Sequence, residues 1–437
     1  MNKSCKNCGQ KFEITDKDLK FYEQIDVPEP TCCPDCRQVR RLVWRNERSL
    51  YNHKCARTGK NVISYISPDK KQVVYSLDEW YKDDWDRLAT GRDFDFNRPF
   101  FEQFRELMQE TPHIALLIGD CENCQYTNFS WKNKNCYLIS ASDFNEDCMY
   151  SSYLFSSRDS VDNLFVNKSE LAYECVDCER LYDSDHCKQC KDSRNMYYCE
   201  ECVGCSNCIG CINLKKAEHQ IFNEQLSKEE YEAQKEHLLK KPEKIRERFN
   251  ELRLKEPIRY ASISKSENCT GDYIVNCKNC DSCFDAIESE DCKYGSYVWH
   301  SKDCMDVNGV NLAELNYEIA GAPDTYNLRF CGSCWVKSNF LTYCYLCRAC
   351  QNCFGCVSLH RNKYCILNKQ YTKEEYEEIV PRIIEHMKKT PAGSSTGEWG
   401  EFFPISIAPF CYNETSAQDY FPITKEEALE KEYPWKE

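Results

Sequence analysis

The sequence is poor in glycine, histidine and methionine, and it has no long apolar run. Among 437 residues, 15 are glycine, 8 are histidine and 6 are methionine, which excludes a collagen-like or glycine-rich disordered chain. Met1 is followed by Asn-Lys-Ser-Cys rather than by the apolar segment of a secretory signal. No run reaches the length of about 18 apolar residues that a membrane helix needs. We therefore expect a cytoplasmic chain without a membrane contact.

Familiar catalytic motifs are also missing from the sequence. It contains no P-loop, no GxGxxG, no GxSxG elbow and no HExxH, so nucleotide-binding, hydrolase and metalloprotease classes have no support. Cys33 precedes its proline, whereas the zinc deaminases have the order PCxxC. We therefore expect no enzymatic activity. A carbohydrate-active β-helix enzyme is the least favoured alternative, because no pair of carboxylates stands out.

Cysteine, in contrast, is abundant, with 34 residues. In a reducing compartment, many cysteines indicate metal ligands or buried thiols rather than disulfides. Two CxxC pairs, Cys5 with Cys8 and Cys33 with Cys36, lie on either side of the segment 9–32. Four thiolates at this spacing satisfy tetrahedral zinc. Cys32 is a competing neighbour, but the Pro-Asp inside the second pair favours Cys33.

The same residues carry a family resemblance. The segments CKNCGQKFEIT and FYEQIDVPEPTCCPDCRQVRR, within about residues 3–42, resemble the treble-clef zinc-ribbon family. The resemblance implies zinc on the four head cysteines and no catalytic activity. The remaining chain is similar to uncharacterised, cysteine-rich bacterial proteins that carry this ribbon.

Four arginines follow the second CxxC pair at helical spacing: Arg37, Arg41, Arg45 and Arg48. They would share one face of a helix that begins near Pro34. One interpretation is a phosphate-contacting stripe for RNA or DNA; the other is a solvated face paired with Glu47 and the acidic body. Residues 1–60 carry a charge of +5, whereas the whole chain carries −14, so only the head suits a nucleic acid.

Residues 61–120 are expected to form a small connector. The segments VISYI and QVVYS flank Pro68–Lys71 and are predicted to pair as a β-hairpin. Ser76 and Glu79 form a capping-box pattern at a helix start. A second helix from Phe100 to Met108 would bury its aromatic side. Cys55 has no CxxC mate, so we expect a buried thiol.

A 12-residue repeat dominates the remaining sequence. Cysteines recur at Cys175, Cys187, Cys199 and Cys211, with a 15-residue step after Ser160. The block is then duplicated: residues 205–232 match 350–377 at an offset of 145, and residues 146–153 match 290–297 at 144. Such a period is too short for helical repeats. It indicates a β-solenoid coil, or half of a 24-residue flattened coil.

The sequence leaves three alternatives open for the solenoid cysteines: buried thiols, which are favoured, zinc ligands, or disulfides. Metal binding is expected most in the densest runs, whose residues are Cys187, Cys190, Cys199, Cys202, Cys205, Cys208, Cys211, Cys344, Cys347, Cys350, Cys353 and Cys356.

We therefore predict a mainly β protein. It comprises a treble-clef zinc ribbon at 1–60, an α+β connector at 61–120, tandem cysteine-rich β-solenoid blocks at 121–226 and 261–371, linker or cap helices at 227–260, a cap helix at 372–392, and a packed aromatic-proline tail at 393–437. The expected function is a zinc-binding scaffold that contacts a protein partner, with nucleic acid as a further candidate at the head. The alternative is a metal-buffering or thiol-redox protein that uses the CxxC columns.

Overall fold

The computed structural model describes residues 1–389 and 397–437 and is mainly β. The chain divides into two compact units, which we describe separately. Unit 1 comprises Met1–Ala115 and Tyr260–Glu437, and unit 2 comprises Leu116–Arg259. The predicted joint at 393–399 falls mostly outside the described residues. No helix in the described ranges is long and apolar enough to cross a membrane.

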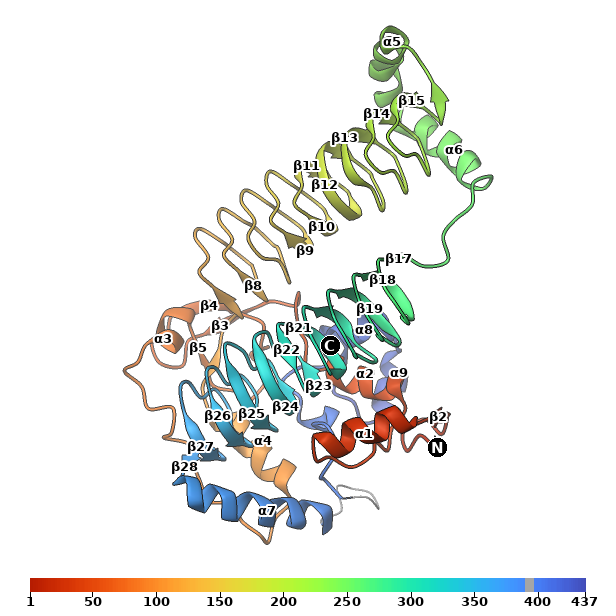
Figure 1. Cartoon of the computed structure of the whole chain (residues 1–437). Coiled ribbons are helices and arrows are strands. Elements are labelled where there is room, and N and C mark those ends of the chain that lie inside the picture. The colour runs from red at the N-terminus through yellow and green to blue at the C-terminus, as the bar shows by residue number, and fades with distance from the viewer. Residues whose placement is uncertain (390–396) are drawn as a thin grey trace. The chain divides into compact units, whose positions relative to one another are not determined.

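Unit 2 contains the first solenoid block, which we call copy 1. Its parallel strands appear in Figure 1 as successive rungs. They are β7 (Ile118–Gly119), β8 (Ser130–Trp131), β9 (Ser152–Phe155), β10 (Leu164–Asn167), β11 (Glu170–Tyr173), β12 (Val176–Asp185), β13 (Lys191–Tyr197), β14 (Ser206–Ile209) and β15 (Glu218–Ile221), with β16 (Glu224–Gln225) antiparallel at the end. Val166 pairs with Leu154 on one side and with Cys178 on the other. Each sequence repeat is therefore one complete coil, which excludes the flattened coil of double length.

Each coil is built from four short sides that meet at four corners. Every third residue points inward, as Cys136, Ile139, Ser142 and Asn145 do, and the residue before it has a left-handed backbone with φ between about 45° and 65°. The inward position held by Ser160 in one coil is held by Ala172 in the next coil, and Cys175 occupies the inward position after Ala172. The 15-residue step in the sequence therefore moves the cysteines to a neighbouring inward position. The pairing between coils is unbroken, because Leu164 still pairs with Val176.

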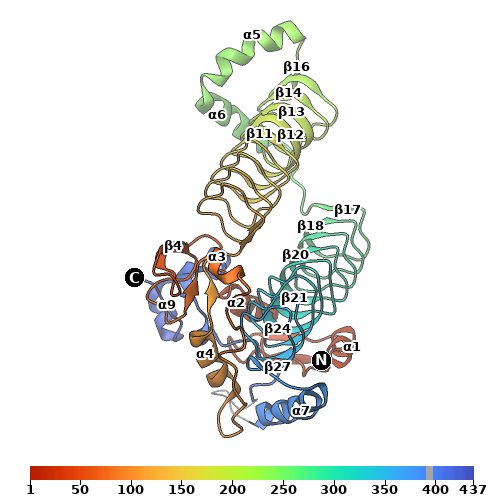
Figure 2. The same cartoon turned by 90° about the vertical axis from the view of Figure 1, so that its left-hand side faces the viewer.

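The last coil of copy 1 is covered by two helices, α5 (Lys228–Leu239) and α6 (Pro242–Arg253) (Figure 2). Ser227 and Glu230 form a capping box at the start of α5. Tyr231 and Ile245 are fully buried against Ile209, Ile221 and Phe222. The helices thereby remove an exposed edge of the sheet, which would otherwise pair with other strands.

Unit 1 contains the second solenoid block, copy 2. Its strands are β17 (Ile263–Ser264), β18 (Gly271–Val275), β19 (Cys283–Ile287), β20 (Ser296–Trp299), β21 (Met305–Asn311), β22 (Ala313–Glu314), β23 (Tyr317–Ala320), β24 (Thr325–Gly332), β25 (Ser338–Thr342), β26 (Gln351–Phe354), β27 (Lys363–Ile366) and β28 (Lys369–Gln370). Ile263 pairs with Ile274, one position short of the regular step, and Thr325 pairs with Ser338, one position beyond it. The longer step explains why the offset between the copies changes from 144 to 145.

The head and connector consist of hairpins and short helices. They are β1 (Asn2–Ser4), β2 (Lys11–Glu13), α1 (Asp16–Gln24), α2 (Pro34–Leu42), β3 (Tyr51–Lys54), β4 (Asn61–Ser64), β5 (Val74–Tyr75), α3 (Leu77–Tyr81), α4 (Phe100–Glu110) and β6 (His113–Ile114). The predicted hairpin is wrong: β4 pairs with β3, and β5 pairs with β6. Helix α1, which has its own capping box at Thr15, was not predicted.

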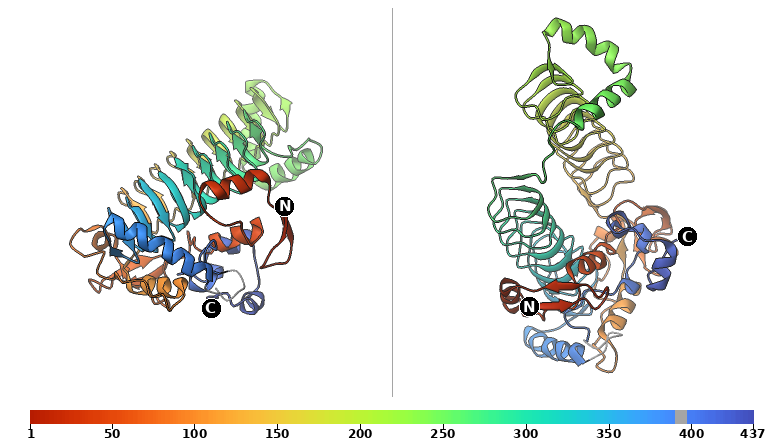
Figure 3. Two further views of the ribbon diagram at one scale, coloured as in Figure 1. Left: turned by 60° about the horizontal axis from the view of Figure 1, so that its bottom comes forward. Right: turned by 90° about the vertical axis from the view of Figure 1, so that its right-hand side faces the viewer.

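Helix α7 (Lys373–Lys389) packs on the last coils of copy 2. Helices α1 and α2 lie beside the strands of copy 2 (Figure 3). Pro381 lies inside α7 instead of ending it, and Pro391 is outside the described residues. The tail contains η1 (Ile405–Ile407), η2 (Tyr412–Glu414), α8 (Ser416–Tyr420) and α9 (Lys425–Glu430). Phe403 packs between Trp44 of the head and Phe104 of the connector.

Candidate metal centre

The first half of the candidate centre is the turn between β1 and β2. Cys5 N–H donates to the Gln10 carbonyl at 2.8 Å, and Gly9 N–H donates to the Cys5 carbonyl at 2.9 Å. Gly9 has φ of +75°, a conformation that costs glycine little and other residues more. This tight turn places the Cys5 and Cys8 thiols on the same side.

The second half is the start of α2. Cys33 is the N-cap residue of this helix and Cys36 lies in its first turn, while Lys6 N–H joins the two halves by donating to the Thr31 carbonyl at 3.0 Å. The four Sγ atoms of Cys5, Cys8, Cys33 and Cys36 all lie within 4.8 Å of one another. In the described part of the chain, this is the one group of three or more Cys, His, Asp or Glu ligand atoms with that property.

The donor set fits a tetrahedral metal ion. The Cys8 and Cys33 Sγ atoms are 3.7 Å apart, and Zn–S bonds near 2.3 Å in a tetrahedron require about 3.8 Å. Burial opposes ionisation of Cys5, but amide donors from Cys33, Cys8 and Asn7 lower its pKa to about 6. Asn7 Nδ2 also donates to the Cys36 Sγ at 3.3 Å. Four thiol ligands leave no position for a substrate, which is typical of structural sites.

Cys32 lies outside this group, as the sequence predicts. Its side chain is buried and is 3.8 Å from the Thr31 hydroxyl. Its carbonyl oxygen accepts a hydrogen bond from Arg37 Nη1 at 2.6 Å. Cys32 and Cys33 are therefore adjacent cysteines with different surroundings, and they form a natural pair for mutagenesis.

The arginines after the second CxxC pair are paired with Glu47 and with acidic residues of the body, as one interpretation predicted, but most of them are buried instead of solvated. Arg37, Arg41 and Arg45 are at most 5% exposed, so they present no stripe to a phosphate backbone. Arg37 Nε is 2.9 Å from Asp306 Oδ2, and Arg41 Nη1 is 3.3 Å from Asp306 Oδ1. Arg45 pairs with Glu47, and Arg48 pairs with Asp419 at the surface. The sequence could not reveal this burial, because Asp306 is far from Arg37 along the chain.

The solenoid cysteines occupy inward positions of the coils. Cys199, Cys202, Cys205 and Cys208 fill all four inward positions of one coil, and Cys344, Cys347, Cys350 and Cys353 do so in copy 2. Their thiols lie near backbone carbonyls: the Cys199 Sγ is 3.4 Å from the Tyr197 oxygen and 3.6 Å from the Cys208 oxygen. The predicted sites at Cys187, Cys190 and Cys211, and at Cys356, show the same carbonyl contacts. In this arrangement the buried thiols can donate hydrogen bonds to backbone carbonyl oxygens.

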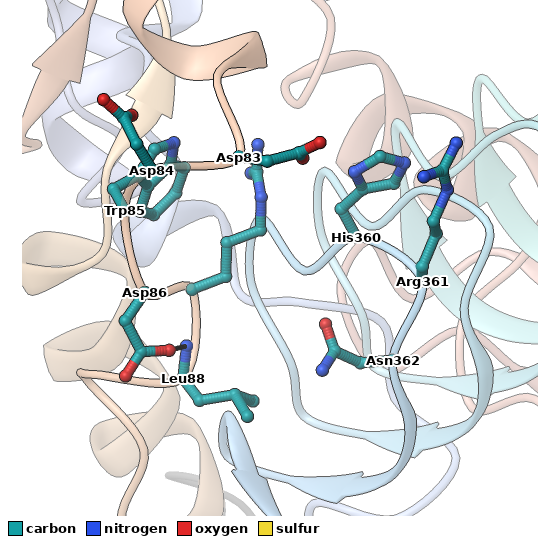
Figure 4. Close-up of a pocket in the computed structure, with 9 residues that line it drawn as sticks. Asp83, Asp84, Trp85, Asp86, Leu88, His360, Arg361 and Asn362 are labelled. Atoms are coloured by element: carbon teal, nitrogen blue, oxygen red, sulfur yellow. Dashed lines mark hydrogen bonds between the residues drawn. The ribbon is translucent and has the colours of Figure 1, made fainter.

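One surface pocket in unit 1 was not predicted. It has a volume of about 580 Å³ and is lined by residues 83–88 and 360–362 (Figure 4). Arg87 stacks on Trp80 and Trp85 and donates to the Ser358 carbonyl at 3.0 Å. Burial, with Arg87, Arg348 and Arg361 nearby, lowers the pKa of His360 to about 4. The described residues that line this pocket include no serine, cysteine or lysine.

A comparison of the chain with protein-family models and with curated proteins finds no match.

Proposed function

We propose that the chain is a non-enzymatic, zinc-stabilised scaffold that recognises a protein partner in a reducing compartment. In this proposal, Cys5, Cys8, Cys33 and Cys36 hold one structural zinc ion in a treble-clef head. The observation that carries the proposal is the four-thiol group with all Sγ atoms within 4.8 Å, because zinc with four protein ligands stabilises a fold and leaves no open position for catalysis.

The solenoids supply the recognition surface. Their inward positions are filled by thiols, small polar side chains and aliphatic side chains, so the outward side chains repeat at the strand spacing of about 4.8 Å. Repeat proteins use such extended surfaces for binding. A nucleic-acid role for the head has less support, because three of the four arginines predicted to contact phosphate are buried in ion pairs.

The test is the metal content of the native protein by mass spectrometry, in wild type and in two single variants. We expect one zinc per wild-type chain, full retention in Cys32→Ser, and loss in Cys33→Ser. Removal of a direct ligand should weaken zinc binding by more than the roughly 10–100-fold typical of an outer-shell partner. Equal metal content in the two variants, or no metal in wild type, contradicts the proposal.

The same measurement of metal content distinguishes the scaffold from the metal-buffering alternative. That alternative would use the two coils that have cysteine at all four inward positions, and it requires several metal ions per chain. A scaffold requires one ion, with buried solenoid thiols that react with a thiol reagent only after unfolding. A stoichiometry well above one in wild type favours the buffer.

A further inference from the structure

One outward column of copy 2 is covered by the chain's own head. The column contains Tyr294, Asp306, Glu318 and Phe330, one residue per coil, each with a left-handed backbone. Arg37 lies 5.5 Å from the Tyr294 ring centre and pairs with Asp306, and Arg40 pairs with Glu318.

Aromatic side chains complete this contact. Tyr317, next to Glu318, packs against Phe21 and Tyr22 of α1, with ring centres 6.1 and 5.4 Å apart. Tyr317, Asp306 and Glu318 are all fully buried. The contact thus joins an arginine-bearing helix to an acidic and aromatic column.

Copy 1 contains the same column without this cover. At an offset of 144, Tyr294, Asp306, Tyr317 and Glu318 correspond to Tyr150, Asp162, Tyr173 and Glu174. In unit 2 these four side chains are exposed, Tyr150 by 53% and Tyr173 by 41%. The backbone is preserved, with φ of 56° at Asp162 and 57° at Asp306.

Later residues of the same column in copy 1 are again packed against arginine side chains. Arg246 of α6 lies over Tyr198, and Arg248 lies 4.0 Å from the Phe222 ring centre. The column is therefore packed against an arginine-bearing helix at Tyr198 and Phe222, as it is in copy 2, whereas its residues from Tyr126 to Glu174 are exposed.

We propose that Tyr150, Asp162, Tyr173 and Glu174 form a docking surface for an arginine-bearing helix of a partner protein. The surface is acidic and aromatic, so guanidinium groups complement it by charge and by stacking. The chain's own α2 does not supply the occupant, because its arginines are buried on copy 2. This inference rests on the scaffold function and names the class of its partner.

The test uses the full-length protein and a fluorescent, helix-stapled peptide with the sequence of residues 34–47, whose binding is followed by anisotropy. We expect saturable binding that weakens about 10-fold or more in the double variant Asp162→Asn, Glu174→Gln. The matched control is Asp159→Asn, Glu170→Gln, which neutralises two exposed carboxylates on another side of the same coils and should bind as wild type does.

Equal binding by the two double variants, or binding that survives replacement of the peptide arginines by glutamine, overturns the docking surface. A wild-type dimer in light scattering that the Asp162→Asn, Glu174→Gln variant abolishes also overturns it, since the occupant is then a second copy. Either result leaves the metal-content test of the scaffold unaffected.

A second inference concerns residues 51–81, which repeat the architecture of the metal centre. Strand β3 pairs with β4 in the same register as β1 with β2, so that Lys54 faces Asn61 as Ser4 faces Lys11. Cys55 N–H donates to the Lys60 carbonyl at 2.9 Å and Gly59 N–H to the Cys55 carbonyl at 2.8 Å. Gly59 has φ of +70°, as Gly9 does in the head.

The segment after the β3–β4 turn also corresponds to its counterpart in the metal centre. Ala56 N–H donates to the Val74 carbonyl at 2.8 Å, as Lys6 N–H does to Thr31. Shortly after Val74, Ser76 is the N-cap of α3, as Cys33 is of α2. The ligand positions Cys5, Cys8, Cys33 and Cys36 are thus occupied by Cys55, Thr58, Ser76 and Glu79.

We infer that residues 51–81 are a second metal-binding unit that has lost its ligands and folds without metal. Hydrogen bonds and an ion pair take the place of the ion: Ser76 N–H donates to the Cys55 Sγ at 3.3 Å, and Arg57 pairs with Glu79 at 3.3 Å. Cys55 is fully buried, and its thiol is surrounded by backbone N–H groups as the thiol of a metal-binding turn is.

The test restores the ligands in the triple variant Thr58→Cys, Ser76→Cys, Glu79→Cys. We expect it to bind one more Co²⁺ per chain than wild type, with the thiolate charge-transfer absorption of a tetrahedral site. Adding Cys55→Ser should remove that extra ion. A folded triple variant with wild-type stoichiometry overturns the inference.

Amide hydrogen exchange of chelated wild-type protein gives an answer even if the triple variant fails to fold. Strands β3 and β4 should stay protected in chelator while β1 and β2 lose protection. Loss of protection in β3 and β4 together with β1 and β2 contradicts a metal-free unit.

Discussion

Left-handed backbone at every third residue is what allows each coil of the solenoids to be so short. Asparagine and aspartate tolerate this conformation better than other side chains, and they also stack along one corner. Asn123 Nδ2 donates to Asn135 at 2.9 Å, and Asn135 Nδ2 donates to Asp147 at 3.0 Å. Where tyrosine or leucine takes the left-handed position, as at Tyr126 and Leu138, the strain is offset by the backbone bonds between coils.

A single buried histidine makes the stability of unit 1 depend on pH. His113 is fully buried, and burial lowers its pKa from 6.5 to about 4. The unfolded chain therefore binds more protons between these values, so stability is complete above pH 6.5 and is lost as the pH falls toward 4. The loss should reach roughly 3 kcal/mol. Urea unfolding of His113→Gln across this range should give a flatter pH profile than wild type.

The control for this prediction is His300→Gln. The His300 side chain is 45% exposed and belongs to the same unit. An equal change of slope in the two variants would show that His113 is not the group responsible.

At the scale of elements, a glutamate from the tail caps a helix of the connector. Pro99 precedes α4 and supplies no side-chain cap. Instead, the buried Glu398 accepts hydrogen bonds from Phe100 N–H and Phe101 N–H, both at 2.8 Å. Glu398→Ala leaves these donors unsatisfied and should cost unit 1 roughly 1–3 kcal/mol in urea unfolding. Glu398→Gln keeps one acceptor and should cost less, and a reversed order contradicts the cap.

Local patterns made much of the fold predictable. The capping boxes at Ser227 and Thr372 depend on residues within one helical turn, and the solenoid period is written in the cysteines. The two CxxC pairs of the metal centre are equally local signals. Strand partners are harder to predict: β4 pairs with β3 across the short Cys55–Lys60 turn, whereas Val74 of β5 pairs with the distant His113 of β6. The alternation of apolar residues in the sequence does not mark the Cys55–Lys60 turn.

At the scale of the whole molecule, buried charge joins the head to copy 2 within unit 1. Asp306 is fully buried and, together with the buried Glu318, compensates the charges of Arg37 and Arg41. After Asp306→Ala, Glu318 would be the one remaining carboxylate near the two arginines, at 4.0 and 3.8 Å, in a dry environment. Breaking such a pair costs roughly 3–5 kcal/mol. We expect the unfolding transition of unit 1 to move to much lower urea, as followed by the fluorescence of its tryptophans.

The matched control is Asp419→Ala, which breaks the exposed pair with Arg48. Exposed ion pairs contribute about 0–1 kcal/mol, so this variant should unfold nearly as wild type does. A similar loss in both variants would mean that burial does not set the strength of the contact. A large loss in Asp306→Ala alone would give the head arginines a structural role: they are the counter-charges of a solenoid column whose acidic residues recur, uncovered, in copy 1.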